Sequence, residues 1–99
     1  MNYLKIYNLT DKEIDEIEKS LEERVVDTFL YESKKVCYIL NIFKEIGVHN
    51  FFDIITTSPT LFLDTVYSIQ KRIDDYGDNT KLAELINEDA HNLFLADLL

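Results

Sequence analysis

The segment SKKVCYILNIFKEIG, residues 33–47, decides the fold. The apolar side chains in it recur three and four residues apart, at Val36, Ile39, Leu40, Phe43 and Ile46. This spacing places them on one face of an α-helix. We expect the helix to begin with Ser33 as its N-cap and to end at Gly47, because glycine readily takes the left-handed conformation that ends helices.

The same pattern returns about 30 residues later. Its apolar positions are Val66, Ile69, Ile73 and Tyr76, and Gly77 follows them. We expect Asp64 to cap this helix. Shorter helices are expected around it: one capped by Asn50, one that begins at Ser58-Pro59, one that begins near Thr80, and a last one with Leu93, Phe94, Leu95, Leu98 and Leu99.

The two patterns match over a long stretch of the chain. A shift of 30 residues places Gly47 on Gly77, and shifts of 31 and 32 align the segments after these glycines. Periods of this size are typical of stacked helical units. The sequence predicts one all-α domain, 1–99, a short stack of helical repeats (long helix, Gly, two short helices) with units of about 11–46, 47–76 and 77–99. An irregular helical bundle whose similar caps imitate a repeat is the alternative.

The N-terminal part is less regular. The first ten residues are expected to form a short lead-in, and Thr10 with Glu13 forms a capping box that predicts a helix from Asp11. The apolar stretch 25–30 continues this helix or forms another one.

Residues 33–95 resemble the helical repeat of the mitochondrial transcription termination factor (mTERF) family. In that repeat a proline is followed by apolar residues three, ten and seventeen positions later, and Pro59 is followed at those spacings by Phe62, Ile69 and Tyr76. Ala90 takes the place of the proline in the next unit. The resemblance implies a curved helical solenoid and, in many members, nucleic-acid binding through a basic concave face. This chain departs from them because it has no basic stripe.

The chain is strongly acidic, with 19 acidic against 10 basic residues and a net charge of -9. The acidic residues are concentrated in segments 11–23 and 74–97. Such a charge repels nucleic-acid phosphates and anionic lipids, and it attracts basic protein surfaces. We therefore expect the partner to be a basic protein surface, such as that of a nucleic-acid-binding protein, while direct nucleic-acid and membrane binding are disfavoured. The single cysteine, Cys37, and the lack of a leader or long apolar run favour a cytoplasmic protein.

No pattern of catalytic or metal-binding residues stands out. His49 and His91 are far apart in the sequence, and neither forms a His-x-x-x-His pair or lies beside Cys37. The segment 74–79 is acidic, but it lacks the spacing of a calcium-binding loop. We expect a protein that is not an enzyme and that needs no metal and no cofactor.

Tyrosine is abundant, with six residues in 99. Five of them fall outside the apolar stripes and are expected to be partly exposed: Tyr3, Tyr7, Tyr31, Tyr38 and Tyr67. Exposed tyrosines among carboxylates are typical of protein interfaces, although tyrosine can also border a small core with its hydroxyl in water.

Three hypotheses for the function follow. The first is an acidic protein-binding module, in its sharpest form an inhibitor that imitates nucleic-acid charge, as small phage-borne inhibitors do. Its predicted partner-binding residues are Asp11, Asp15, Glu16, Glu22, Asp74, Asp75, Asp78, Tyr31 and Tyr67. The second is an mTERF-like nucleic-acid-binding repeat. The third is a structural subunit of a homo-oligomer, such as a homodimer. Its subunits would touch through Phe29, Leu30, Leu98 and Leu99.

Overall fold

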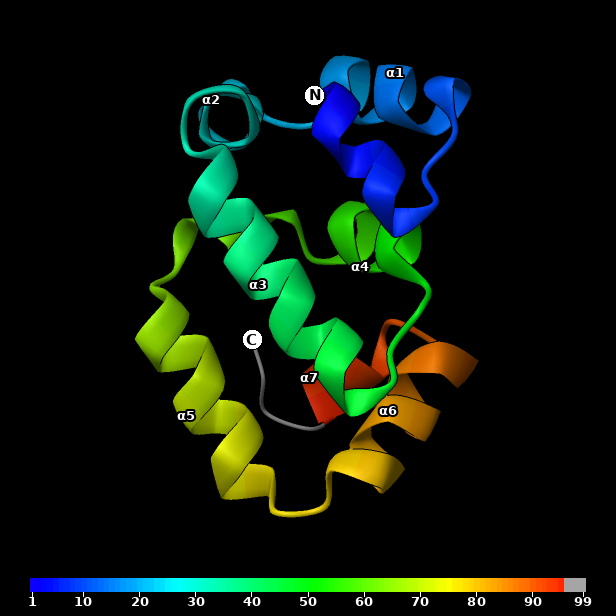
Figure 1. Ribbon diagram of the computed structural model, residues 1–99, viewed down its shortest axis with the longest axis vertical. Coiled ribbons are helices and arrows are strands. Elements are labelled where there is room, and N and C mark those ends of the chain that lie inside the picture. The colour runs from blue at the N-terminus through cyan, green and yellow to red at the C-terminus, as the bar shows by residue number, and fades with distance from the viewer. Residues whose placement is uncertain (96–99) are drawn as a thin grey trace.

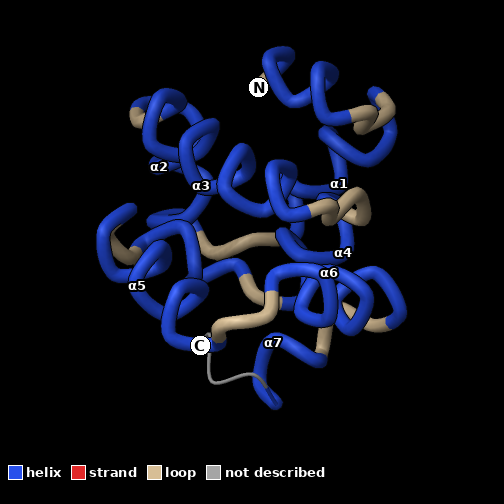
Figure 2. Tube along the Cα trace, turned by 60° about the horizontal axis from the view of Figure 1, so that its bottom comes forward, coloured by secondary structure: helices blue, strands red, loops and turns tan. Residues whose placement is uncertain are grey.

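The computed structural model describes residues 1–95, which are helices joined by short loops, with no strand in this part of the chain (Figure 2). The helical segments, with η for 3-10 helices, are η1 (Asn2–Tyr7), α1 (Asp11–Ser20), α2 (Glu23–Tyr31), α3 (Ser33–Ile46), α4 (Phe51–Thr57), η2 (Pro59–Leu63), α5 (Val66–Tyr76), α6 (Asn79–Glu88) and α7 (Asn92–Leu95). The prediction of an all-α fold is confirmed. The apolar stretch 25–30 belongs to a separate helix, α2.

Helix α3 is the centre of the molecule. It contacts α2, η2, α5 and α6, and in Figure 1 it crosses the middle of the fold between the N-terminal helices and α6. Its buried residues are Val36, Ile39, Leu40, Ile42 and Phe43. The segment from which the fold was predicted therefore supplies the face on which the other helices pack.

The core extends to both sides of α3. The rings of Phe29 in α2 and Phe62 in η2 lie 5.0 Å apart, and both side chains are fully buried. The prediction of Phe29 as a surface contact of a homo-oligomer is therefore wrong, because α2 turns this ring inward. Leu30 beside it is 42% exposed, whereas Leu98, Leu99 and the side chain of Phe94 lie outside the described residues.

Several predicted helix ends are confirmed. Thr10 and Glu13 form both hydrogen bonds of the capping box at the start of α1. Gly47 and Gly77 end α3 and α5 with φ values of 108° and 85°. Both values lie in the left-handed region, where a side chain would be strained.

Two N-caps lie one residue from their predicted positions. Ser33 is the first residue of α3, and Glu32 precedes it as the cap. Helix α5 is capped by Thr65, whose hydroxyl accepts from the Ser68 amide, while Asp64 binds the Thr65 amide. In each case the cap was assigned one residue away, which is the usual uncertainty of a boundary.

Helix α6 begins before Thr80. Asp78 caps it by accepting a hydrogen bond from the Lys81 amide at 3.0 Å, so the helix starts at Asn79. Asn50 precedes α4 as predicted, but its side chain does not cap that helix. It donates instead to the Ile86 carbonyl of α6 at 2.7 Å.

The first ten residues are part of the packed structure and not a loose lead-in. They form η1, in which Leu4 and Tyr7 are buried, and Leu9 is buried just after it. The Tyr7 ring meets the Phe51 ring edge to face at 5.3 Å. A 3-10 helix has three residues per turn, so the apolar residues of this segment do not follow the spacing that predicts an α-helix.

The order of elements recurs along the chain. A helix, a left-handed glycine, a second helix and a short helix appear as α3, Gly47, α4 and η2, and again as α5, Gly77, α6 and α7. Helices α3 and α5 run in the same direction in Figure 1. This order agrees with the predicted register, while a shared backbone geometry of the units stays a prediction.

Candidate protein-interaction surface

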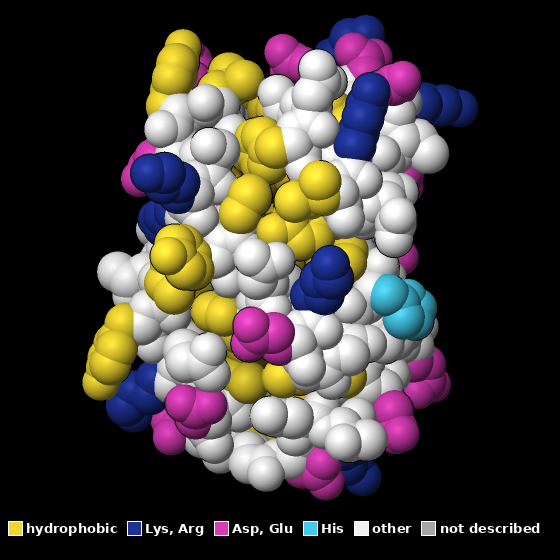
Figure 3. All heavy atoms as spheres, in the orientation of Figure 1, with side chains coloured by type: hydrophobic (Ala, Val, Ile, Leu, Met, Phe, Trp, Pro, Cys, Tyr) yellow, Lys and Arg dark blue, Asp and Glu magenta, His cyan; other side chains and the backbone are white. Residues whose placement is uncertain are grey.

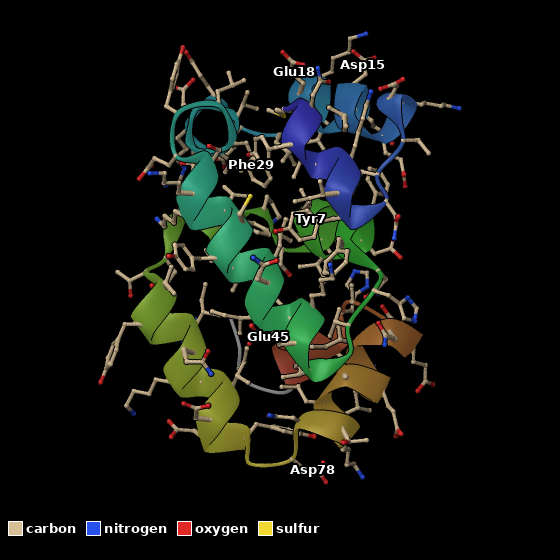
Figure 4. All side chains as sticks on the ribbon, in the orientation of Figure 1. Tyr7, Asp15, Glu18, Phe29, Glu45 and Asp78 are labelled. Carbon is tan, nitrogen blue, oxygen red and sulfur yellow. The ribbon has the colours of Figure 1, made fainter. Side chains whose placement is uncertain are left out.

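The two acidic segments of the chain lie at opposite ends of the molecule. Figure 4 shows Asp15 and Glu18 of α1 at one end of the long axis and Asp78, between α5 and α6, at the other. The molecule measures 34 Å along this axis. The predicted partner-binding acids therefore form two separate groups and not one continuous cluster.

Many of these acids are already paired within the chain. Four of them accept from a cation: Asp11 from Lys5 at 2.7 Å, Asp15 from Lys19 at 2.9 Å, Glu22 from Arg24 at 2.7 Å, and Asp75 from Lys71 at 3.2 Å. The hydrogen bond to Asp15 raises the pKa of Lys19. All four pairs are exposed, so each stabilises the fold only slightly, but each reduces the charge offered to a partner.

Two further predicted acids stabilise helices. Asp78 caps α6, and Asp74 accepts from the Gln70 amide at 2.9 Å along α5. Only Glu16 among the predicted acids is exposed without such a contact in the described part of the chain. Glu18 beside it and Glu84 and Glu88 of α6 are also exposed and outside the ion pairs of residues 1–95. These three acids were not among the predicted partner-binding residues. The sequence shows which opposite charges stand four residues apart, but it does not show which of them form ion pairs in the fold.

The tyrosines divide into two groups. Tyr31, Tyr38 and Tyr67 are 81%, 64% and 76% exposed, which confirms their prediction as surface residues. Tyr7 is buried, so its prediction as an exposed residue is wrong. Tyr3 is half-buried, and its hydroxyl donates to the Phe29 carbonyl at 2.6 Å.

The buried Tyr7 forms hydrogen bonds with α3. Its hydroxyl donates to Asn41 Oδ1 at 2.8 Å and contacts the Cys37 carbonyl at 3.2 Å. Burial, followed by hydrogen bonding with Cys37, raises the pKa of Tyr7 to about 12. Burial also raises the pKa of Tyr3. Both phenols are therefore neutral at physiological pH, and Tyr7 fixes the amide of Asn41 on α3.

A groove of about 510 Å³ runs between α3 and α5. Its lining residues are Tyr38, Asn41, Ile42, Glu45, Val66, Tyr67 and Gln70. A second hollow on α3, lined by Lys34 and Cys37, shares Tyr38 and Asn41 with the groove. Figure 3 shows apolar side chains over this middle part of the face, with Asp and Glu mostly around its margin.

Tyr38 belongs to this groove although it was not among the predicted partner-binding residues. It lies one helical turn after Lys34 and one turn before Asn41 and Ile42, on the side of α3 next to the buried stripe. The signal in the sequence is an aromatic residue at the edge of a core stripe. Tyr31 lies outside the groove, at the end of α2.

The described residues hold no group of three His, Cys, Asp or Glu side chains that could bind a metal. His91 contacts Asp89 at 2.9 Å, and this hydrogen bonding lowers the pKa of Asp89, first through the His91 amide and then through its ring. The His49 amide donates to the Asn87 side chain. Both histidines therefore have structural contacts at turns.

The basic residues of α5, and Lys44 of α3, contact other side chains of the molecule. On α5, Lys71 is paired with Asp75, and Arg72 with Asp64 at 2.7 Å. On α3, the Lys44 ammonium lies 6.0 Å from the centre of the Tyr7 ring. The cations of α5 are thus compensated by carboxylates of the same region.

Comparison with protein-family models, with curated proteins and with solved structures finds no match to this chain. No helix among the described residues combines the length and the apolar character needed to cross a membrane.

Proposed function

We propose that the protein is a non-enzymatic protein-binding module that uses its acidic surface and exposed tyrosines to bind a basic surface of another protein. The observation that carries this proposal is the combination of a net charge of -9 with three highly exposed tyrosines. Ion pairs within the chain cannot remove this excess of negative charge, since each pair uses one acid and one base. In its sharpest form the module imitates nucleic-acid charge and inhibits a nucleic-acid-binding protein.

The mechanism has two stages. The negative field attracts a basic partner over distances of about a Debye length and raises the association rate. Tyrosine side chains then lose their contact with water against the partner and supply most of the binding energy, as aromatic anchors do at protein interfaces. The acids at the margin contribute more to association rate and specificity than to final affinity.

The resemblance to the mTERF repeat supports the architecture in this proposal and not the activity. Nucleic-acid binding would require unpaired cations along one face, and those of α5 are paired with Asp64 and Asp75. We also propose a cytoplasmic location, because Cys37 is free and the chain has no second cysteine to pair with it.

The test compares proteins retained from a lysate by three immobilised forms. One is the natural chain, one carries Glu16→Gln and Glu18→Gln on α1, and one carries Glu84→Gln and Glu88→Gln on α6. The two variants lose equal charge at different places. We expect basic proteins to be retained less as salt rises, and each variant, with two negative charges fewer, to bind them more weakly than the natural chain.

Retention that does not change between low and high salt would contradict the proposal, as would equal binding by all three forms. The inhibitor form makes a further demand. A short DNA or RNA duplex should displace the retained protein, and a ternary complex in place of displacement would overturn the idea of a nucleic-acid mimic.

A further inference from the structure

We propose that the groove between α3 and α5 binds a single amphipathic helix of the partner, with the basic N-terminal end of that helix beside Glu45. The inference rests on the proposed function, since it identifies where on the acidic module the partner docks. It commits to a helical ligand of about three turns and to one direction of binding. The shape of the groove, its hydrogen-bonding groups and its charge favour such a ligand.

The groove has an apolar floor and aromatic walls. Ile42 is buried and Val66 half-buried at its base, and the exposed Tyr38 and Tyr67 come one from each helix. Two aromatic walls over an aliphatic floor can receive a row of apolar side chains. Because the hollow at Lys34 and Cys37 shares Tyr38 and Asn41 with the groove, the two together extend from Lys34 to Glu45 of α3 and suit an elongated ligand.

The backbone of the groove favours a helix over an extended peptide. Both walls are α-helices, whose amide and carbonyl groups are already hydrogen-bonded within each helix. The backbone of an extended peptide would therefore have only side chains as polar partners in the groove, and most of its amide and carbonyl groups would stay unpaired there. A helix has its own backbone groups satisfied and can bind through side chains alone.

The length of the groove fits about three helical turns. From Lys34 to Glu45, α3 rises through 11 residues, or about 16 Å at 1.5 Å per residue. A ligand helix of the same length presents apolar side chains at positions i, i+3 or i+4, and i+7 along one face. Three such anchor side chains would lie in the groove, in contact with Tyr38, Ile42 and Tyr67.

The charges of the groove are arranged with a direction. Lys34 lies at one end and Glu45, the acid that lines the groove, at the other. Asp74 follows Gln70 by one turn on α5 and accepts its hydrogen bond, so a second carboxylate lies beyond the same end. A helix has a partial positive charge at its N-terminus and a negative one at its C-terminus. The favoured ligand therefore runs antiparallel to α3, with Lys or Arg in its first turn.

The other charge features agree with a basic protein helix and not with a second copy of this chain. Two copies would bring together two surfaces that each belong to a molecule of charge -9. A basic helix gains from the same field, and Glu45 has no cation within ion-pair distance among residues 1–95 to compete with it.

The experiment uses two synthetic helical peptides of 14 residues with equal composition. Both carry leucine at the anchor positions and a hydrocarbon staple on the outer face, so that circular dichroism shows equal helicity. One has lysines in its first turn and glutamates in its last turn, and the other has these reversed. Binding to the full chain is measured by titration, and the side-chain amides of Asn41 and Gln70 are followed by NMR.

We expect the peptide with N-terminal lysines to bind about fivefold more tightly than its reverse, as two favourable surface charge contacts allow. Tyr38→Ala and Tyr67→Ala should each weaken it about tenfold or more, as truncation of aromatic anchors does. Glu45→Gln should reduce the difference between the peptides to about twofold, because the contact at Lys34 remains. Tyr31→Ala is the matched control, an equally exposed tyrosine outside the groove, and should change binding less than twofold.

Four results would overturn the proposal. Equal binding of both peptides, or losses with Tyr31→Ala as large as with Tyr38→Ala, would exclude this site. A dimer in sedimentation velocity that Tyr38→Ala dissociates would show that a second copy occupies the groove. If the lysate proteins still depend on Glu16 and Glu18 while the groove variants bind them normally, the proposed function stands and only the docking site is wrong.

Discussion

Gly47 and Gly77 occupy equivalent places in the sequence, but the turns that they form are held in different ways. Both glycines end a long helix in the left-handed conformation. The next residue differs, because Val48 is 2% exposed while Asp78 is exposed and caps the next helix. The same local signal is therefore followed by a core residue in one unit and by a polar cap in the other.

The Gly47 turn is held by bonds at two levels. The Gly47 amide donates to the Lys44 carbonyl at 3.1 Å and the Val48 amide to the Phe43 carbonyl at 3.0 Å, which together form a Schellman motif. Asn87 of α6 then bonds the turn from outside. It accepts from the His49 amide at 2.9 Å and donates to the Gly47 carbonyl at 3.0 Å.

The Gly77 turn is held only locally. In the described structure α5 ends without the two Schellman bonds, and a Cβ atom added to Gly77 would meet nothing within 4 Å. Asp78 caps α6 immediately afterwards. A glycine at the same place in each unit therefore sets the left-handed conformation that ends the helix. The hydrogen bonds from neighbouring helices set how much each turn contributes to stability.

The largest effect should come from exchanging the residues that follow the glycines. Val48→Asp places a carboxylate in the core without a partner and should lower the free energy of unfolding by about 3 kcal/mol or more. Asp78→Val removes only one capping bond and should cost about 1 kcal/mol. Urea unfolding followed by circular dichroism measures both. Equal costs would show that the two turns are alike.

The next effect concerns the bonds made by Asn87. Asn87→Ala removes two hydrogen bonds and should cost about 2 kcal/mol, at roughly 1 kcal/mol for each bond. Hydrogen exchange at the His49 amide should become faster. Asn79→Ala, at the exposed start of α6, is the control and should change stability by less than about 0.5 kcal/mol. Unchanged exchange at His49 would mean that Asn87 does not hold the turn.

The glycines themselves should respond alike. Alanine in the left-handed region costs about 1–2 kcal/mol, and the reduced freedom of the unfolded chain returns about 0.4–1 kcal/mol. Gly47→Ala and Gly77→Ala should therefore each cost about 1 kcal/mol in thermal or urea unfolding. The nearest atom to an added Cβ at Gly47 is Ala83 Cβ at 3.6 Å, an ordinary contact. A much larger loss at Gly47 would show that Ala83 cannot accommodate the methyl group.

This difference marks the limit of what the sequence could predict about the fold. The apolar spacing of α3 and α5 and the two glycines located both long helices and their ends, because these signals lie within a few residues of one another. The bonds from Asn87 and Asn50 join residues more than 35 positions apart, and no local pattern indicates them. The segment η1 was not predicted as a helix, because the burial of Tyr7 depends on residues far from it in the sequence, such as Phe51 and Asn41.

The same reasoning applies to the candidate surface. The exposure of Tyr31 and Tyr67 could be predicted, since both fall outside the core stripes. The groove itself could not, because it exists only where α3 and α5 lie side by side and Tyr38 faces Val66 and Tyr67 across it. The acidic segments were found by counting charges, but their separation to opposite ends depends on the tertiary fold (Figure 4).

The smallest effect at neutral pH should come from Tyr7, which joins η1 to the first unit and has no counterpart on the second. Tyr7→Phe keeps the ring contact with Phe51 and loses the hydrogen bond to Asn41, so it should lower the free energy of unfolding by about 0.5–1 kcal/mol at pH 7.

The pKa of Tyr7, raised to about 12 in the folded chain, makes this contribution depend on pH. The unfolded chain releases this proton near the ordinary value of 10, so the stabilising contribution is complete below pH 10 and is lost as the pH rises towards 12. Urea midpoints of the natural chain should therefore fall between about pH 10 and 12, and those of Tyr7→Phe should fall less, because only Tyr3 keeps a raised phenol pKa. Equal slopes for both proteins would show that Tyr7 ionises freely and does not tie η1 to α3.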